Sequence, residues 1–87
     1  MSDYKKYYQG KKILVTGGAG AIGSNLVRGL CEAGAKIVFI LDDFSSSHKW
    51  NVPALPNVLL VEGSILDEVK VKRVFFEKPD CVFHLAA

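Results

Sequence analysis

Several kinds of residue are scarce in this 87-residue chain, and each scarcity excludes a class of protein. It has two cysteines, Cys31 and Cys81, which are too few for a disulfide-rich secreted domain, and neither has a partner at metal-ligand spacing. Free thiols in a reducing compartment are favoured over a disulfide. The net charge of +2 is too small to indicate nucleic acid or a membrane surface as a partner. No apolar run is long enough to span a bilayer.

The first eleven residues also lack something, namely the apolar core of a signal peptide. They are rich in lysine and tyrosine, so residues 1–11 are predicted to form a solvated polar leader. The remaining composition is ordinary for one small soluble domain, expected over residues 12–87. The expected location is the cytoplasm.

The chain does contain a glycine-rich turn in an informative setting. The sequence from Thr16 to Gly23 is TGGAGAIG, and its glycines Gly17, Gly20 and Gly23 are spaced G-x-x-G-x-x-G. An apolar segment typical of a buried strand precedes it, and a helical pattern follows. A second apolar strand then ends in an acidic residue. Together these features predict a dinucleotide-binding site.

Each glycine has a physical role in that prediction. Gly17 lets the chain turn sharply out of the strand, Gly20 leaves room for approaching phosphates, and Gly23 lets the helix lie close to the strand. The first turn of a helix offers unpaired backbone N–H groups and a partial positive charge, which suit a pyrophosphate. The alternative is a glycine-rich turn that binds nothing.

Asp42 is the acidic residue, and it stands 19 residues beyond Gly23. A carboxylate at this place can accept hydrogen bonds from both hydroxyls of the adenosine ribose and repels a 2′-phosphate. No arginine follows closely to bind such a phosphate. The sequence therefore predicts NAD rather than NADP, and the alternative is that Asp42 or Asp43 only begins a turn.

The fold predicted from the order of elements is α/β, the N-terminal portion of a Rossmann-type doubly wound parallel sheet in strand order 3-2-1-4. The strands are expected at residues 12–16, 36–41, 58–62 and 81–85, and the helices at 22–33 and 68–77. The first helix is expected to bury its apolar side chains and to end at Gly34, and close packing is expected to explain Gly29 within it. The second helix is expected to be capped by Asp67. The apolar side chains expected to be buried by the first helix are Ile22, Leu26, Val27, Leu30 and Ala33.

The quoted motifs resemble those of the extended short-chain dehydrogenase/reductases, and among these the NAD-dependent nucleotide-sugar epimerases and dehydratases. The resemblance rests on the glycine turn, the loop LDDFSS from Leu41, the segment EGSI from Glu62 and the end PDCVFHLAA from Pro79. It implies contacts with the pyrophosphate for Gly17, Gly20, Ala21, Ile22 and Gly23, and with the adenosine for Asp42, Asp43, Phe44, Ser45, Ser46, Ser64 and Ile65. It also implies that Leu85, Ala86 and Ala87 line the path to the nicotinamide.

Two positions depart from the family pattern. Ser64 stands where the family usually has an aspartate that bonds the adenine, and Ala21 stands where an aromatic residue is common. A serine hydroxyl accepts a hydrogen bond less strongly than a carboxylate does, and the smaller Ala21 opens space near the phosphates. Both departures concern the affinity for the cofactor.

The family's catalytic pair, Tyr-x-x-x-Lys, is not found where the resemblance requires it, after a fifth strand. Tyr7 with Lys11 and Tyr8 with Lys12 have the spacing, but they precede the first strand and are not expected to be catalytic. His84 is expected to be a packed or hydrogen-bonded strand residue. The predicted function is the NAD-binding N-terminal portion of a nucleotide-sugar epimerase or dehydratase.

The alternatives are a non-catalytic NAD-binding fragment and a ligand-free structural remnant. The last strand would be an exposed apolar edge, so a further segment, a partner or a homodimer is expected to cover it.

Overall fold

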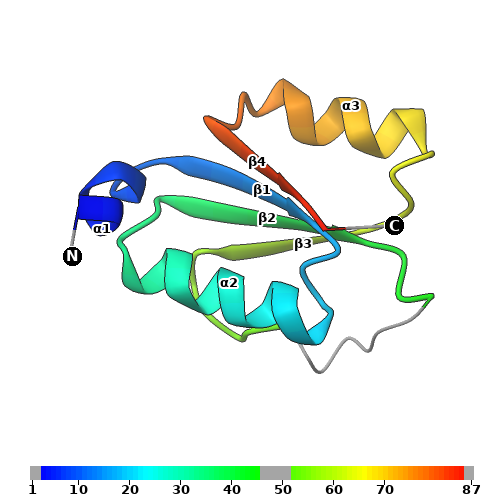
Figure 1. Cartoon of the computed structure of the whole chain (residues 1–87). Helices are drawn as coiled ribbons and strands as arrows, with labels where there is room; N and C mark the ends of the chain where they lie inside the picture. Colours follow the sequence, from blue (N-terminus) through cyan, green and yellow to red (C-terminus); the bar gives the residue numbers. More distant parts are fainter. Residues whose placement is uncertain (1–2, 46–51, 86–87) are drawn as a thin grey trace.

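The computed structural model describes residues 3–45 and 52–85, and these form a parallel sheet with helices on both faces. The strands lie in the order β3-β2-β1-β4, and every neighbouring pair is parallel. Figure 1 shows α2 covering one face of the sheet and α3 the other. The predicted fold class and strand order are therefore confirmed. The strands are β1 (Lys12–Thr16), β2 (Ile37–Asp42), β3 (Val58–Glu62) and β4 (Cys81–His84), and the helices are α1 (Asp3–Tyr8), α2 (Ala21–Glu32) and α3 (Glu68–Phe76).

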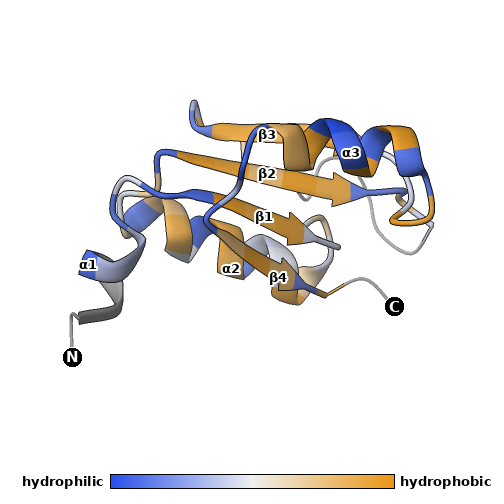
Figure 2. Ribbon diagram, turned by 90° about the horizontal axis from the view of Figure 1, so that it is seen from above, coloured by the Kyte–Doolittle hydropathy of each residue, from blue (hydrophilic) through white to orange (hydrophobic). Residues whose placement is uncertain are grey.

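The core lies on both sides of the two central strands. Their side chains alternate between two apolar clusters, one beneath α2 and one beneath α3. In Figure 2 the central strands are hydrophobic along almost their whole length, as expected for strands covered on both faces. The cluster on the α2 side includes Ile13, Val15, Val27, Leu30, Val38 and Ile40. The cluster on the α3 side is Leu14, Phe39, Leu41 and Val74.

Helix α2 starts one residue earlier and ends one residue earlier than predicted, and Gly34 follows it with a φ of 87°. Two expectations about its side chains are wrong. Ile22 is 79% exposed because the buried face of α2 runs through Gly23, Val27 and Leu30, and Ile22 lies outside that face. A Cβ added to Gly29 would meet nothing within 4 Å, so close packing does not explain that glycine.

Helix α3 begins as predicted and ends at Phe76, one residue short of the predicted end. The Asp67 carboxylate accepts hydrogen bonds from the backbone N–H groups of Val69 (3.1 Å) and Lys70 (3.2 Å), which confirms the predicted cap. Val74 is the residue of α3 that is buried, and the helix leaves Phe75 and Phe76 exposed.

The segment expected to be a solvated leader contains the short helix α1, and part of it packs on the sheet. The Tyr8 side chain lies against the α2-side cluster, with its ring centroid 6.0 Å from that of Phe83. The Gly10 N–H donates to the Gly34 carbonyl at 2.8 Å. These contacts tie the beginning of the chain to the amino-terminal end of the sheet, at the left of Figure 1.

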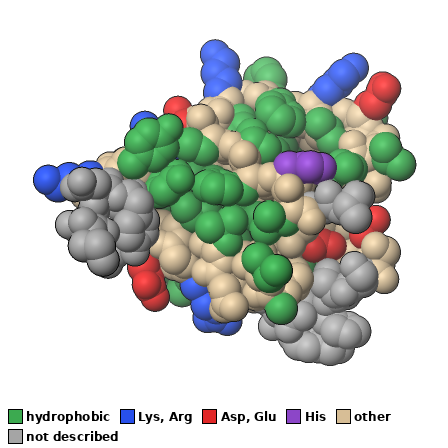
Figure 3. All heavy atoms as spheres, in the orientation of Figure 1, with side chains coloured by type: hydrophobic (Ala, Val, Ile, Leu, Met, Phe, Trp, Pro, Cys, Tyr) green, Lys and Arg blue, Asp and Glu red, His purple; other side chains and the backbone are tan. Residues whose placement is uncertain are grey.

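Strand β4 forms one edge of the sheet, and the expectation that this edge is apolar is confirmed. Val82 is 47% exposed, and Phe75 on the neighbouring helix is also exposed. Figure 3 shows hydrophobic side chains gathered around β4 on the face in view. A segment or partner that covers this edge stays a prediction. Within residues 3–45 and 52–85 no helix combines the length and the apolar character needed to cross a membrane.

Candidate functional site

The predicted site residues that the structure describes lie at the carboxyl-terminal edge of the sheet, at the right of Figure 1. Three backbone hydrogen bonds hold the loops there. The Gly17 N–H donates to the Leu41 carbonyl at 2.8 Å, and the Gly63 N–H donates to the Asp42 carbonyl at 2.9 Å. The Leu85 N–H donates to the Thr16 carbonyl at 2.9 Å. The glycine turn, the end of β2 and the loops after β3 and β4 therefore surround one position, as ligand sites in this architecture require.

Gly17 and Gly23 are required by the fold itself. Gly17 has a φ of 78°, a left-handed conformation that side chains rarely adopt. A Cβ on Gly23 would lie 2.4 Å from the Gly17 carbonyl oxygen and 2.8 Å from the Gly18 Cα. The close approach that Gly23 permits is thus between α2 and the turn, at the point where the turn leaves β1.

Gly20 differs from these two glycines because the fold does not need it. Its φ of −74° suits any residue, and an added Cβ would meet the Gly17 carbonyl oxygen at an ordinary 3.7 Å. Gly20 is the N-cap of α2, and it supplies no side chain to cap the helix. No side chain of the cap therefore competes with a ligand for the first-turn N–H groups of α2, which are the groups that bind phosphates in other proteins.

Asp42 ends β2 and is bound to the glycine turn. Its Oδ2 accepts a hydrogen bond from the Ala19 N–H at 3.1 Å, and its Oδ1 accepts one from the Phe44 N–H at 2.8 Å. Phe44 has a φ of 60°, which is uncommon for a residue other than glycine. The carboxylate does begin a turn, as the alternative expected, and it also reaches the predicted phosphate loop. No feature of the sequence points to Ala19 as its partner.

The other residues predicted to contact the adenosine include Asp43 and Ser64, whose side chains accept hydrogen bonds from backbone N–H groups of their own loops. The Asp43 Oδ1 accepts the Ser45 N–H at 2.9 Å, and this hydrogen bond lowers the pKa of the Asp43 carboxyl. The Ser64 Oγ accepts the Leu66 N–H at 3.0 Å, which uses part of the hydroxyl's capacity to accept from another group. The side chain that replaces the family's aspartate is therefore already engaged by its own loop.

A pocket of about 220 Å³ lies beside the site, between the sheet and α3. It is lined mainly by apolar side chains, among them the predicted site residue Ile65. Thr16 and His84 also line it, and the Thr16 Oγ1 lies 2.8 Å from the His84 Nδ1. This confirms that His84 is a hydrogen-bonded strand residue. It also adds Thr16, a buried residue that the sequence did not single out as part of the site.

The Tyr-x-x-x-Lys pairs near the start of the chain lie at the opposite edge of the sheet. The Lys11 Nζ lies 5.2 Å from the centroid of the Tyr7 ring, and Lys12 belongs to β1. The neighbouring Cys81 thiol raises the pKa of Tyr7, which is the reverse of what a tyrosine base needs. The prediction that these pairs are not catalytic agrees with this geometry.

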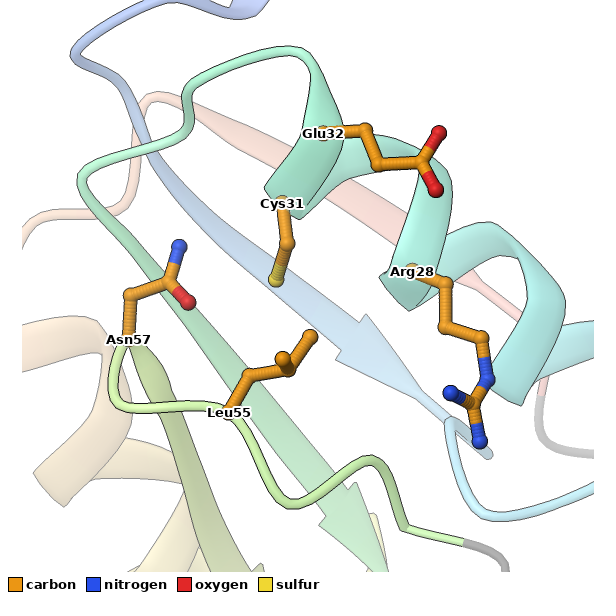
Figure 4. A pocket seen from close by; sticks show the side chains of 5 residues that line it. All are labelled: Arg28, Cys31, Glu32, Leu55 and Asn57. Atoms are coloured by element: carbon orange, nitrogen blue, oxygen red, sulfur yellow. The ribbon is translucent and has the colours of Figure 1, made fainter.

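A second pocket, of about 310 Å³, lies toward the amino-terminal edge, between α2 and the segment before β3 (Figure 4). Its lining contains no predicted site residue and consists of Arg28, Cys31, Glu32, Leu55 and Asn57. Partial burial raises the pKa of the Cys31 thiol, so this thiol is not an activated nucleophile. Both cysteines are free thiols. In the described ranges no group of three or more His, Cys, Asp or Glu side chains could hold a metal ion.

Ser46, Ala86 and Ala87 are predicted site residues that lie outside the described residues. The described ones fall into two groups. The turn residues Gly17, Gly20, Ala21, Ile22 and Gly23 lie with Asp42 around the start of α2. Asp43, Phe44, Ser45, Ser64, Ile65 and Leu85 belong to the loops that follow β2, β3 and β4.

Comparison with known proteins gives the family. Residues 13–87 match the family described as "Epimerase: NAD dependent epimerase/dehydratase family". The structure resembles that of the epimerase Mth375 from Methanothermobacter thermautotrophicus, with a TM-score of 0.94 and 56% identity over 99% of this chain and 25% of that chain. It also resembles the enzyme WbmF of Bordetella bronchiseptica in complex with NAD+ and UDP, with a TM-score of 0.84 and 40% identity over 92% of this chain and 24% of that chain.

A relative by sequence is the UDP-glucose 4-epimerase of Streptococcus mutans, which is 39% identical over 77 residues, covering 86% of this chain and 22% of the relative. The chain thus spans about a quarter of the length of each of these proteins. The matched family is NAD-dependent, so the prediction of NAD as its cofactor is confirmed at the level of the family.

Proposed function

The chain belongs to the NAD-dependent epimerase/dehydratase family, and we propose that it is the NAD-binding N-terminal portion of an enzyme that acts on a nucleotide-linked sugar. The observation that carries the proposal is Gly20. A glycine that the fold does not require stands at the helix N-terminus, where a side chain would obstruct a phosphate.

Each part of the turn has a role in this proposal. The first-turn N–H groups of α2, at Ala21, Ile22 and Gly23, would donate to the pyrophosphate. Exposure of the Ile22 side chain supports a ligand-facing position for this turn. The adenosine would lie along the loops of residues 42–46 and 64–65, and residues 85–87 would border the path to the nicotinamide.

Bound NAD would supply a hydride acceptor for a sugar carbon, and the residues of this chain would hold and orient it. Asp42 would accept hydrogen bonds from the ribose hydroxyls, and its negative charge would disfavour the 2′-phosphate of NADP. The sugar is proposed to be linked to UDP because WbmF forms a complex with UDP and the similar protein of Streptococcus mutans is a UDP-glucose 4-epimerase. The cytoplasm stays the proposed location, in keeping with two free thiols.

A calorimetric titration of the chain with NAD and with NADP tests the proposal. We expect NAD to bind more tightly than NADP. We expect Asp42→Asn to reduce the difference between the two affinities, because it removes the negative charge that repels the 2′-phosphate. Tighter binding of NADP would refute the choice of cofactor. If neither dinucleotide binds, the dinucleotide site itself is refuted, and a ligand-free structural role gains support.

One observation favours a second candidate, a module that binds NAD without turnover. The Tyr-x-x-x-Lys pairs of the chain begin at Tyr7 and Tyr8 on α1, the helix that Figure 1 shows at the end of the sheet opposite the glycine turn. Sequence beyond Ala87 distinguishes the two functions: a Tyr-x-x-x-Lys pair after a fifth strand favours the enzyme, and a continuation without such a pair favours the module.

A further inference from the structure

Asp42 contacts the phosphate turn as well as standing where the ribose is proposed to bind. We propose that Asp42 is a positioning residue, which fixes the Gly17–Gly20 turn through the Ala19 N–H before the cofactor arrives. This inference rests on the proposed function, since the turn is the proposed phosphate site. Ribose recognition and phosphate recognition would then depend on one carboxylate.

The Ala19 N–H is the link between the two. Ala19 is buried, and its N–H donates to the Asp42 Oδ2 at 3.1 Å, across 23 positions of sequence. A buried N–H that loses its acceptor is destabilising, so the turn depends on this oxygen. The Asp42 Oδ1, by accepting the Phe44 N–H at 2.8 Å, holds the carboxylate in the orientation that reaches the turn.

The turn also makes other contacts with strand β2. The Gly17 N–H donates to the Leu41 carbonyl, and a Cβ on Gly18 would lie 2.9 Å from the Ile40 side chain. The turn therefore rests on the end of β2, and the Asp42 carboxylate adds a side-chain hydrogen bond to this contact. Within the turn, the Gly20 N–H donates to the Gly17 carbonyl at a longer 3.3 Å.

The carboxylate has the capacity for both roles. An ionised carboxylate has two oxygens, each of which can accept more than one hydrogen bond, so backbone N–H groups and ribose hydroxyls can share it. An asparagine offers one oxygen and one NH₂ group. In Asp42→Asn at least one of the two backbone N–H groups therefore faces a donor and loses its acceptor.

A comparison of two ligands separates the two roles. The affinities of the wild-type chain, of Asp42→Asn and of Asp42→Ala are measured for NAD and for an NAD analogue that lacks both hydroxyls of the adenosine ribose. Alanine removes the acceptor of the Ala19 N–H in every case, whereas asparagine can keep it. If Asp42 positions the turn, Asp42→Ala still weakens binding of the analogue, by about tenfold, the fold-change that one charge-assisted hydrogen bond carries. Equal affinity of Asp42→Ala and the wild type for the analogue overturns the proposal and leaves Asp42 as a ribose ligand alone.

Asp67→Asn is the matched control. Asp67 also accepts two backbone N–H groups, but both bonds go to its Oδ1, which asparagine can retain. This variant is expected to bind both ligands as the wild type does. An equal loss of affinity in both variants would indicate a general effect of removing a carboxylate and would overturn the proposal.

Amide hydrogen exchange tests the positioning role without any cofactor. In the wild-type chain the Ala19 amide is expected to exchange at least about tenfold more slowly than the Ile22 amide, which has no intrahelical acceptor. Equal rates overturn the proposal even where Asp42→Asn fails to fold. If the wild-type chain protects Ala19 but does not bind NAD, the proposed function fails and the positioning of the turn stands.

Discussion

Gly23→Ala is the substitution for which the structure gives the sharpest expectation. The new Cβ would lie 2.4 Å from the Gly17 carbonyl oxygen, 2.8 Å from the Gly18 Cα and 3.1 Å from the Gly18 carbonyl carbon. All three neighbours are backbone atoms of the turn, so no side chain can rotate away. Either α2 or the turn must move.

The magnitude follows from two opposing effects. Alanine in place of glycine favours the helix by about 1 kcal/mol. Overpacking against atoms that cannot yield costs about 3 kcal/mol, the upper end of its usual range. The net expectation is a loss of about 2 kcal/mol in the free energy of unfolding, which lowers Tm by about 10 °C in a domain of this size.

Thermal and urea unfolding followed by circular dichroism would measure this loss, and Gly29→Ala is the matched control. Gly29 lies in the same helix, and a Cβ there would meet nothing within 4 Å. That variant is expected to be more stable than the wild type, by up to about 1 kcal/mol. If Gly23→Ala is as stable as the wild type, or if both variants shift in the same direction, the reasoning from the contact of α2 with the turn is refuted.

Three further substitutions test other parts of the structure. Gly20→Ala is expected to leave Tm unchanged, because its Cβ would lie 3.7 Å from the Gly17 carbonyl oxygen, and to weaken NAD binding by about tenfold in a calorimetric titration; a lower Tm with unchanged affinity would contradict this. Asp67→Ala removes both hydrogen bonds of the α3 cap and is expected to lower the free energy of unfolding in urea by about 1 kcal/mol, whereas Asp67→Asn, which keeps the accepting oxygen, stays close to the wild type. The hydrogen bond from Ser45 lowers the pKa of Asp43 below its ordinary 3.8, so the stabilisation from this carboxylate is complete above that pH and is lost as the pH falls through the lowered pKa. The stability advantage of the wild type over Asp43→Ala in urea should shrink below pH 3.8, and an advantage that grows there would contradict the assignment.

The features that the sequence predicts well are those determined by local chemistry and by chain order. Residues 13–15 and 37–41 are apolar without alternation, so they are expected to be covered on both faces, and the crossover rule then gives the strand order. The cap at Asp67 and the left-handed glycines at Gly17 and Gly34 follow from the same local rules. The glycine turn, the end of β2 and the loop after β3 could be placed at one edge before any coordinate was known.

The features that the sequence does not predict depend on what lies across the space between elements. Helical periodicity places Ile22 on the apolar side of α2, but the face that the helix buries runs through Gly23, Val27 and Leu30, and the Ile22 side chain is exposed. The tyrosines near the start of the chain predict a solvated leader, because nothing local indicates that Tyr8 meets Phe83 across the sheet. The Asp42–Ala19 hydrogen bond joins residues 23 positions apart, and no spacing in the sequence predicts it.

The three glycines of the motif, Gly17, Gly20 and Gly23, are present for different physical reasons, although the sequence pattern does not distinguish them. Gly17 is needed for its φ of 78°, and Gly23 is needed because the backbone of the turn lies 2.4 Å from the position of a Cβ. Both would be required of a turn that binds nothing. Gly20 is not needed by the fold, and the proposed approach of a phosphate to the start of α2 accounts for it. The motif therefore supports a binding site through the one glycine whose replacement the fold would tolerate, and a variant at Gly20 separates loss of cofactor from loss of structure in a way that no variant at Gly17 or Gly23 can.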